Sequence, residues 1–512
     1  MKNILYFFCV MASSLLAAQA PEIQWQRTFG GTGSEYAKCV RQAHDGGYIV
    51  IGTTPSNNGD VSGNHGNNDL WMIKLDPDGK LEWQKCLGGT GSESGNAIRL
   101  TADGGYIIAG DTSSNNGDVS GGNGSNDFWI VKIDSAGNIQ WQNSLGGTGG
   151  DHANDIDLTS DGGYIAAGTT SSNNGDVSGN HGGILDGWIV KLSSTGDLEW
   201  QTTVGGSGTD QFRSVSQTID GGYIAAGITN SNDGDVSGNH GSNDFWVVKL
   251  SATGELQWQK TLGGTGSDVG QYIVQNNDGT YMAIGTTSSF NGDVSGNHGG
   301  SEYWMVKLSE TGTMLWQKCI GGTSSDIARA MQPTNDGGFI ITGNSSSNDY
   351  DASYTQGLGD FWVVKTDALG NVQWEKSMGG TGADDSTSVQ ETSDGGFIIT
   401  GQTTSTDGDI TENKGIYDFW VVKLEAPAMS LDDNLWTNVK IYPNPANKRV
   451  QVETTFTGAT IKIMDIQGKQ IAYYNTTSPI TTIDTGALVD GMYILQITHG
   501  NSVLNKKLII TN

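Results

Sequence analysis

Residues 96–145 read NAIRLTADGGYIIAGDTSSNNGDVSGGNGSNDFWIVKIDSAGNIQWQNSL, and they contain the pattern of four short β-strands. NAIRLT alternates into the tight turn ADGG, and YIIAGDT returns from that turn. A long polar loop follows, and then come DFWIVKID, the turn SAGN and IQWQNSL. Alternating or fully apolar runs between Asp-Gly or Gly-Asn turns are the signals of strands and hairpins. The stretch therefore predicts one four-stranded antiparallel sheet.

The same unit occurs seven times, with a spacing of 58 or 59 residues. One tryptophan series marks its fourth strand: Trp25, Trp83, Trp141, Trp200, Trp258, Trp316 and Trp374. A second series marks its third strand: Trp71, Trp129, Trp188, Trp246, Trp304, Trp362 and Trp420. Repeated four-stranded units are typical of a β-propeller. The sequence predicts an all-β fold in which residues 21–424 form a seven-bladed β-propeller of four-stranded blades.

The two ends of the repeat region predict how the ring closes. The chain begins with a fourth-strand sequence, IQWQRTF at residues 23–29, before any first strand. It leaves the seventh unit after the third strand, at residues 419–424. We therefore expect the N-terminal strand to complete the last blade, because a closed ring leaves no exposed sheet edge.

Several motifs of the unit resemble those of known propellers. DGGYIIAG at residues 103–110, GGTGS at residues 88–92 and the terminal FWVVKL together resemble bacterial β-propeller repeats of secreted, multi-copy surface proteins. KLSATGELQW at residues 249–258 is similar to the tryptophan-docking motif of quinoprotein propellers. That resemblance implies that the fourth-strand tryptophan packs between neighbouring blades. It implies a fold and no particular activity, because propellers have many unrelated functions.

The N-terminus has the pattern of a secretory signal peptide at residues 1–20. Lys2 precedes an apolar run at residues 4–16, and Ala18-Gln19-Ala20 provides the small residues of a cleavage site. The apolar run is too short to span a bilayer, and no later stretch reaches that length. We therefore expect no transmembrane segment. Residues 425–437 have the composition of a linker.

The pattern changes at residue 438, where short alternating strands predict a small Ig-like β-sandwich over residues 438–512. Four motifs occur here in order: YPNP at residues 442–445, DIQGK at 465–469, LVDGMY at 488–493 and KKLII at 506–510. They closely resemble the type A C-terminal sorting domain of the type IX secretion system of Bacteroidota. The matching residues are Tyr442, Pro443, Asn444, Pro445, Gly468, Gly491, Tyr493, Lys506 and Lys507.

This resemblance implies that the type IX secretion machinery recognises the C-terminal domain. The protein would then be secreted, or attached at the cell surface after it has crossed the outer membrane. The alternative is an ordinary Ig-like binding domain, because this fold has many functions.

The charge of the chain limits its partners. The formal net charge is −28 at pH 7. Phosphate binding needs clustered Lys and Arg, so nucleic acid is not an expected partner. A charge of this sign is consistent with a solvated extracellular surface. We expect a monomer.

Two acidic positions recur in every unit and are the candidate site residues. The first follows the Gly-Gly pair of the crossover between units, and we expect it to form a ring at the mouth of the central channel: Glu35, Glu93, Asp151, Asp210, Asp268, Asp326 and Asp384. The second lies in the long polar loop: Asp60, Asp118, Asp176, Asp235, Asp293, Asp351 and Asp409. We expect both polar segments to lie on one face of the propeller, the loop-bearing face.

A role that is repeated seven times is usually architectural, since a unique site would mark one or two copies with residues that the others lack. Asp and Asn side chains satisfy backbone donors in turns. Calcium binding by the loop aspartates is the first alternative, because oxygen-rich loops that contain glycine suit this ion. The spacing does not match an EF-hand loop. No other cofactor is expected.

Two classes of function remain. The first is a non-enzymatic binding or adhesion scaffold for a glycan or a protein. The alternative is an extracellular carbohydrate-active enzyme that uses two carboxylates of the loop-bearing face as acid and base. No catalytic motif supports the enzyme. A sialidase propeller would need a triad of arginines. No motif groups any three of the arginines in the repeat region, which are Arg27, Arg41, Arg99, Arg213 and Arg329.

Overall fold

The computed structural model describes residues 19–427, 439–454, 456–465, 469–499 and 502–511. The chain divides into two compact units, residues 1–426 and residues 427–512. The predicted signal peptide lies outside the described residues, except for residues 19 and 20. Most of the predicted linker also lies outside them.

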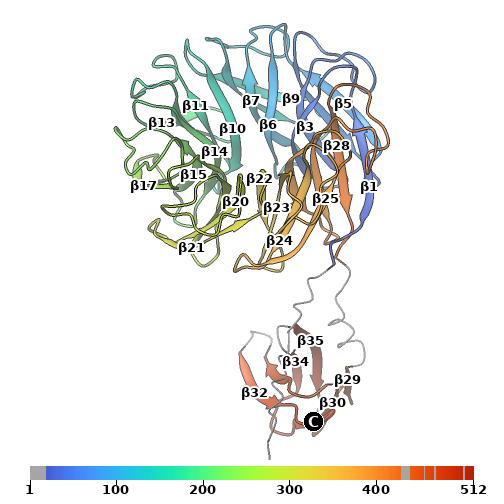
Figure 1. Cartoon of the computed structure of the whole chain (residues 1–512). Coiled ribbons are helices and arrows are strands. Elements are labelled where there is room, and N and C mark those ends of the chain that lie inside the picture. Colours follow the sequence, from blue (N-terminus) through green and yellow to red (C-terminus); the bar gives the residue numbers. More distant parts are fainter. Residues whose placement is uncertain (1–18, 428–438, 455, 466–468, 500–501, 512) are drawn as a thin grey trace, which may run out of the picture. The chain divides into compact units, whose positions relative to one another are not determined.

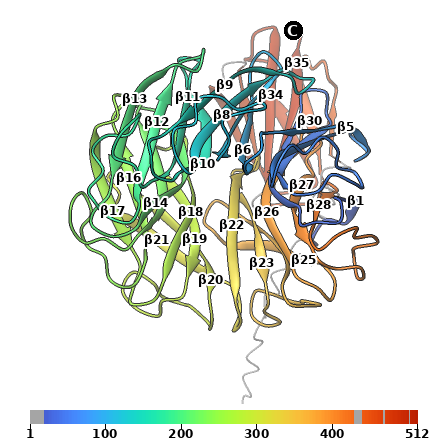
Figure 2. The ribbon, with the colours of Figure 1, turned by 90° about the horizontal axis from the view of Figure 1, so that it is seen from above.

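The first unit is a ring of seven antiparallel four-stranded sheets (Figures 1 and 2). The innermost strands are β2 (Tyr36–Gln42), β6 (Glu93–Leu100), β10 (Asp151–Leu158), β14 (Asp210–Gln217), β18 (Asp268–Gln275), β22 (Asp326–Pro333) and β26 (Asp384–Glu391). The second strands are β3 (Tyr48–Thr54), β7 (Tyr106–Thr112), β11 (Tyr164–Thr170), β15 (Tyr223–Thr229), β19 (Tyr281–Thr287), β23 (Phe339–Ser345) and β27 (Phe397–Thr403).

The third strands are β4 (Asp69–Leu75), β8 (Asp127–Ile133), β12 (Asp186–Leu192), β16 (Asp244–Leu250), β20 (Glu302–Leu308), β24 (Asp360–Thr366) and β28 (Asp418–Leu424). The outer strands are β5 (Leu81–Leu87), β9 (Ile139–Leu145), β13 (Leu198–Val204), β17 (Leu256–Leu262), β21 (Met314–Ile320), β25 (Val372–Met378) and β1 (Ile23–Phe29). We number the blades 1 to 7 from β2 to β26. The predicted all-β class and the seven-bladed propeller of four-stranded blades are confirmed.

The core lies between the blades, along the second and third strands. Both faces of these strands are buried, so YIAAGIT and DFWVVKL in blade 4 are buried at every position. Runs of β-branched and aromatic residues form strands that are covered on both faces. The indole N–H of each third-strand tryptophan, such as Trp246, donates to an outer-strand side chain, here Gln259 Oε1 at 3.1 Å. Polar and apolar contacts therefore hold each blade in the same register.

The N-terminal strand closes the ring, as predicted. Strand β1 pairs with β28 in an antiparallel register that runs from Ile23 opposite Leu424 to Phe29 opposite Phe419. The indole N–H of Trp420 donates to Gln26 Oε1 at 2.8 Å, which reproduces in blade 7 the bond of the other blades. Two segments from opposite ends of the repeat region therefore share one sheet.

The second unit is a small β-sandwich with one sheet of three strands and one of four, in the orders β29-β30-β33 and β32-β31-β34-β35. Its strands are β29 (Lys440–Tyr442), β30 (Arg449–Glu453), β31 (Thr460–Met464), β32 (Gln470–Asn475), β33 (Ile480–Asp484), β34 (Gly491–His499) and β35 (Ser502–Ile510). Side chains such as Val450, Ile461 and Leu495 are fully buried between the sheets. The predicted sandwich is confirmed.

Candidate functional site

The seven carboxylates that we expected at the channel mouth lie under the crossovers between blades. They start the inner strands, but each is at most 2% exposed. In blade 4 the carboxylate of Asp210 accepts from the Gly206 N–H at 2.8 Å, and from the hydroxyls of Ser231 and Thr229. The prediction that these side chains line the channel mouth was therefore wrong, because all seven are buried: Glu35, Glu93, Asp151, Asp210, Asp268, Asp326 and Asp384. The reason is that the crossover backbone needs these acceptors.

The seven loop aspartates also bond to the crossovers. The Asp235 N–H donates to Gly205 O at 2.8 Å, and the Gly205 N–H lies 3.4 Å from Asp235 Oδ2. Asp60 and Gly30 form the same reciprocal pair, at 2.9 and 3.0 Å. Among the described residues, no three or more His, Cys, Asp or Glu side chains are placed so that they could hold a metal ion. The loop aspartates therefore clamp each loop onto the crossover that enters the same blade.

A third carboxylate at each junction was not among the predicted site residues. It begins every third strand: Asp69, Asp127, Asp186, Asp244, Glu302, Asp360 and Asp418. One oxygen of each is buried and has no hydrogen-bond partner among the described residues. That oxygen faces a crossover glycine, so that a Cβ built on Gly30 would lie 2.2 Å from Asp418 Oδ1. The signal in the sequence was the acidic residue that precedes the aromatic residues of every third strand.

The electrostatics of these junctions are unfavourable at neutral pH. Burial, together with Asp384 and Asp409, raises the pKa of Asp360 to about 6. Burial, together with Glu35 and Asp60, raises the pKa of Asp418 to about 6. Ionising a buried carboxylate beside others costs free energy. Glycine is required in the crossover because any side chain would meet these oxygens.

Two loops on the loop-bearing face depart from the repeat and expose aromatic rings. Blade 5 carries Phe290, which is 66% exposed, and blade 6 carries Tyr350 and Tyr354, which are 68% and 60% exposed. Tyr350 has φ 53° and is the only non-glycine residue with a positive φ in the described part of the chain. The other six blades have glycine here, with φ between 64° and 69°: Gly59, Gly117, Gly175, Gly234, Gly292 and Gly408.

In blade 6 the backbone at Tyr350 is therefore strained, while the tyrosine side chain is exposed. The left-handed conformation costs a residue other than glycine about 1–2 kcal/mol. Burial does not repay this cost, because the Tyr350 side chain is largely in solvent. The Tyr350 ring contacts that of His298 of blade 5, at 4.3 Å between ring centroids. Strain of this kind is concentrated at functional sites.

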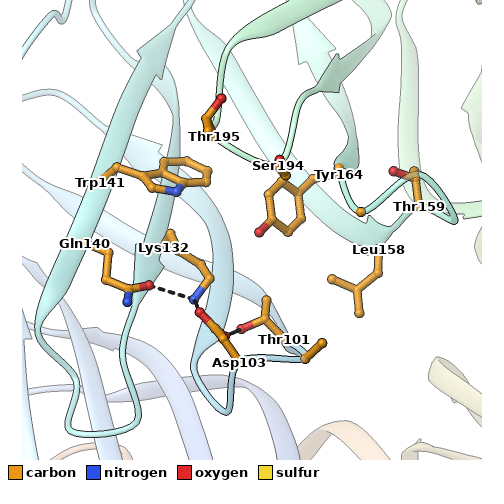
Figure 3. Close-up of a pocket in the computed structure, with 13 residues that line it drawn as sticks. Thr101, Asp103, Lys132, Gln140, Trp141, Leu158, Thr159, Tyr164, Ser194 and Thr195 are labelled. Atoms are coloured by element: carbon orange, nitrogen blue, oxygen red, sulfur yellow. Dashed lines mark hydrogen bonds and ion pairs between the residues drawn. The ribbon is translucent and has the colours of Figure 1, made fainter.

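Cavities at the turn ends of the strands repeat between blades. One of about 670 Å³ lies between blades 2 and 3 and is lined by Trp141, Tyr164 and Thr195 (Figure 3). Another, of about 560 Å³, lies between blades 4 and 5. In the first, Lys132 Nζ donates to Asp103 Oδ2 and Gln140 Oε1, each at 2.8 Å. The charged and amide groups of this cavity therefore bond to one another.

The same cavities show where the outer-strand tryptophans pack. A Cβ built on Gly196, in a turn of blade 3, would lie 2.8 Å from the Trp141 ring of blade 2. The packing of this tryptophan against the next blade agrees with the resemblance to tryptophan-docking propellers. Glycine fits this turn for two reasons. A Cβ would clash with the Trp141 ring, and the φ of 88° at Gly196 is in the left-handed region.

The sorting residues lie at several places on the β-sandwich. Asn444 joins the YPNP segment to β35, since its side chain donates to Lys507 O at 2.7 Å and accepts from the Ile509 N–H at 2.9 Å. The hydroxyl of Tyr493 donates to Val489 O at 3.0 Å. Lys506 and Lys507 are exposed beside a cavity of about 340 Å³ that Met464 and Met492 also line. Pro443 and Pro445 both follow cis peptide bonds. Gly468 lies outside the described residues.

Residues 440–511 match the family of the secretion system C-terminal sorting domain. This confirms the predicted sorting domain. The type IX secretion machinery is therefore a partner of the chain, which is exported to the cell surface or secreted. In the described residues no helix has the length and apolar character that are needed to cross a membrane.

The chain is also similar to other known proteins. The regulatory protein FlaEY of Caulobacter vibrioides is 24% identical in an alignment of 251 residues that covers 43% of this chain and 26% of that protein. Sqt1 from Chaetomium thermophilum has a TM-score of 0.39 and 10% identity, over 78% of this chain and 100% of that one. Puromycin hydrolase has a TM-score of 0.41 and 11% identity, over 85% and 62%. At these values neither solved structure bears on function.

Proposed function

We propose that the exported propeller is a non-enzymatic binding scaffold, and that it binds a neutral glycan through the exposed aromatic residues of blades 5 and 6. The observation that carries the proposal is Tyr350, a strained and exposed residue where six blades have glycine. A unique site is expected where one or two copies carry residues that the others lack, and Tyr350 is such a residue, kept at a cost in stability.

The chemistry of the surrounding loop suits a sugar. Tyrosine offers a flat apolar face and a polar hydroxyl, so it can stack on the C–H face of a sugar ring and bond to its hydroxyls. Asn348 and Gln356 lie in the same loop and provide amide groups, whereas Asp349 and Ser353 already bond to Thr323 and Glu375. The net charge of −28 favours a neutral ligand over an acidic one on this face.

The engagement of the repeated carboxylates supports a function without catalysis. A general acid or base must reach its substrate. The carboxylate of Asp210 is fully buried and accepts three hydrogen bonds. The loop aspartates bond to the crossover backbone, which also supports the preference for a structural role over calcium binding.

The test compares the secreted protein with Tyr350→Gly on a glycan array, with and without calcium, alongside hydrolysis assays on the glycans that bind. We expect binding to fall by about tenfold or more, as for an aromatic hot spot. The stability should stay within about 1 kcal/mol of the parent, because glycine adopts this φ without strain. We expect no hydrolysis.

The matched control is Leu369→Ala. Leu369 is a 65% exposed residue in the β24–β25 turn of the same blade, away from the loop-bearing face, and the change should leave binding as it is. Undiminished glycan binding by Tyr350→Gly would contradict the site, and turnover of a bound glycan would contradict the non-enzymatic role. Binding of a protein in place of any glycan would contradict the ligand class.

A further inference from the structure

A layer of side chains in the central channel is set by a bulge in every inner strand. In blade 1 the register against β3 shifts between Ala37 and Cys39, which leaves Lys38 unpaired. The same shift occurs in the other six inner strands. A bulge re-aims the extra side chain. The residues of this bulge layer are Lys38, Asn96, Asn154, Arg213, Gln271, Arg329 and Thr387.

The bulge layer is exposed to the channel, and none of its residues is buried, whereas the residue before each of them is. The inner strands surround the axis of the ring (Figure 2), and a cavity of about 330 Å³ is lined by one or two residues from each of the seven, all of which follow the bulge layer along their strands. A cavity that all seven strands line is the central channel. Asn96 and Asn154 bridge the wall, because each donates to a carbonyl of the next blade at 2.7 Å.

The charge of the bulge layer is opposite to that of the chain. It contains Lys38, Arg213 and Arg329 and no carboxylate, in a chain with 55 acidic and 27 basic residues. These three residues come from blades 1, 4 and 6, of which no two are neighbours, so they approach one another only across the channel. Desolvation inside the channel, and then the charge of Arg329, lowers the pKa of both Lys38 and Arg213, and the more weakly acting carboxylates Asp385 and Asp111 oppose this shift at Lys38.

Two of the three cations lack a partner. Arg329 lies 3.3 Å from Asp385 Oδ2, but Lys38 and Arg213 have no hydrogen bond or ion pair with any residue that the structure describes. The arginines of the cavity itself differ. Arg99 is 2.8 Å from Asp155, and Arg41 donates to Val40 O at 2.7 Å. Cations that stay unpaired in a confined channel are unfavourable unless an anion occupies the space between them.

We propose that Lys38, Arg213 and Arg329 form a binding site for an oxyanion in the central channel. Guanidinium and ammonium groups bind carboxylate, sulfate and phosphate oxygens through charge-assisted hydrogen bonds. The amide side chain of Gln271, in the same layer, adds a neutral donor. The oxyanion is either a free inorganic ion or the acidic group of a sugar residue. This site does not depend on the neutral-glycan site of blades 5 and 6.

The experiment measures binding of inorganic phosphate, inorganic sulfate and glucuronate to the secreted protein by calorimetry at constant ionic strength. We expect saturable binding of at least one of them, with one ion per chain. Phosphate or sulfate without glucuronate identifies a free inorganic ion as the ligand. Glucuronate without phosphate or sulfate identifies an acidic sugar. An absence of saturable binding by all three would overturn the proposal.

The variant is the double substitution Lys38→Gln and Arg213→Gln, which should lower the affinity by about tenfold or more, because two charge-assisted bonds are lost. It should melt no lower than the parent without anion, since two unpaired cations are removed. Lys38→Arg keeps the positive charge, so this single variant should still bind the anion even if the double variant is destabilised. Lys318→Gln, on outer strand β21, is the control and should bind like the parent. Equal affinity of the double variant and the parent would overturn the site.

Discussion

Two rings of polar side chains lie three residues apart on the same inner strands and differ in sequence, burial and bonding. The first ring is acidic in all seven blades, at most 2% exposed, and bonded to the crossover backbone. The second ring is the bulge layer, in which Lys38, Asn96 and Arg213 hold equivalent places and face the channel. Identical and satisfied groups maintain the fold, because every junction has the same unpaired backbone donors. In the second ring, which varies between blades, Lys38 and Arg213 have no bonded partner among the described residues, and these are groups that we propose to bind a ligand.

The loop-bearing face repeats this contrast. Asp235 and its counterparts form reciprocal bonds with a crossover glycine, whereas Tyr350 replaces a glycine and points into solvent. In this propeller we therefore expect substitutions at repeated positions to affect folding. Substitutions at positions that depart from the repeat should affect binding. The following predictions test this separation.

The largest effect is expected from deletion of residues 24–29, which removes most of β1. The deletion leaves the edge of β28 unpaired and removes the partner of the Trp420 indole. An exposed sheet edge promotes aggregation. We expect loss of cooperative thermal unfolding and elution as aggregates in size-exclusion chromatography. Arg27→Gln, in the same strand, should behave like the parent. A deletion variant that melts and elutes like the parent would contradict the closure.

A smaller loss is expected for Asp235→Ala, because it strands the Gly205 N–H. An unsatisfied buried donor costs about 1–3 kcal/mol, measured by urea unfolding. Asp235→Asn keeps an acceptor oxygen and should recover most of the loss. Any effect on ligand binding should follow the folded fraction alone. Lost binding by a fully folded Asp235→Ala protein would place the repeated position in a binding site.

The effect of Asp360→Asn should depend on pH. The pKa of Asp360 is raised from 3.8 to about 6, so between these values the folded protein holds a proton that the unfolded chain releases. The contribution of this group to stability therefore falls as the pH rises through this window. Asn removes the charge, and we expect a gain of about 1–2 kcal/mol at pH 7.5 and a smaller gain at pH 5, by urea unfolding.

The control for this prediction is Asp336→Asn, which should have the opposite sign. Burial acts to raise the pKa of Asp336, but bonds from Lys365, Thr334 and Gly338 outweigh it and lower the pKa. The ionised form is therefore the stabilising one, and the variant should lose stability at pH 7.5. An equal gain for Asp360→Asn at both pH values would contradict the assignment of its raised pKa.

The smallest effect is expected from calcium. A ligand that binds only the folded state raises its stability by mass action. The loop aspartates already accept bonds from the crossover glycines, so we expect millimolar calcium to change the free energy of unfolding by less than about 1 kcal/mol. A large rise in melting temperature that EDTA reverses would support calcium sites in these loops. Magnesium at the same concentration controls for ionic strength.

Much of the fold could be predicted from the chain because each blade carries its own local signals. The turns at Asp103-Gly104-Gly105 and the apolar runs around Trp129 define strands without knowledge of their neighbours. The position of β1 followed from the order of strand types at the two ends. The sorting domain could be recognised because its motifs lie in order within about 75 residues. Local patterns of this kind can be recognised in a sequence because turn hydrogen bonds and side-chain alternation involve residues that are only a few positions apart.

Side-chain direction was less predictable. Glu35 and its counterparts were expected at the channel mouth, since they start the strands that line it. Their oxygens instead accept from a crossover N–H four residues earlier and from hydroxyls at and just after the end of the second strand of the same blade, contacts that a strand pattern does not specify. The bulge at Lys38 was not visible either, because it appears as a register shift against a partner strand. Comparison of the seven repeats does not reveal it, because the residues on both sides of that position also vary between repeats.

The sequence by itself determined the number of blades, the strand that closes the ring and the presence of a sorting domain, because repetition and local hydrogen-bonding patterns specify these features. Only the tertiary structure decided which polar groups are satisfied. It buries fourteen repeated carboxylates at seven junctions, and it brings Lys38, Arg213 and Arg329 from non-neighbouring blades to one channel. The physical reason is that burial and electrostatic interaction depend on distance in space, and ring closure joins residues that lie up to about 400 positions apart in the chain.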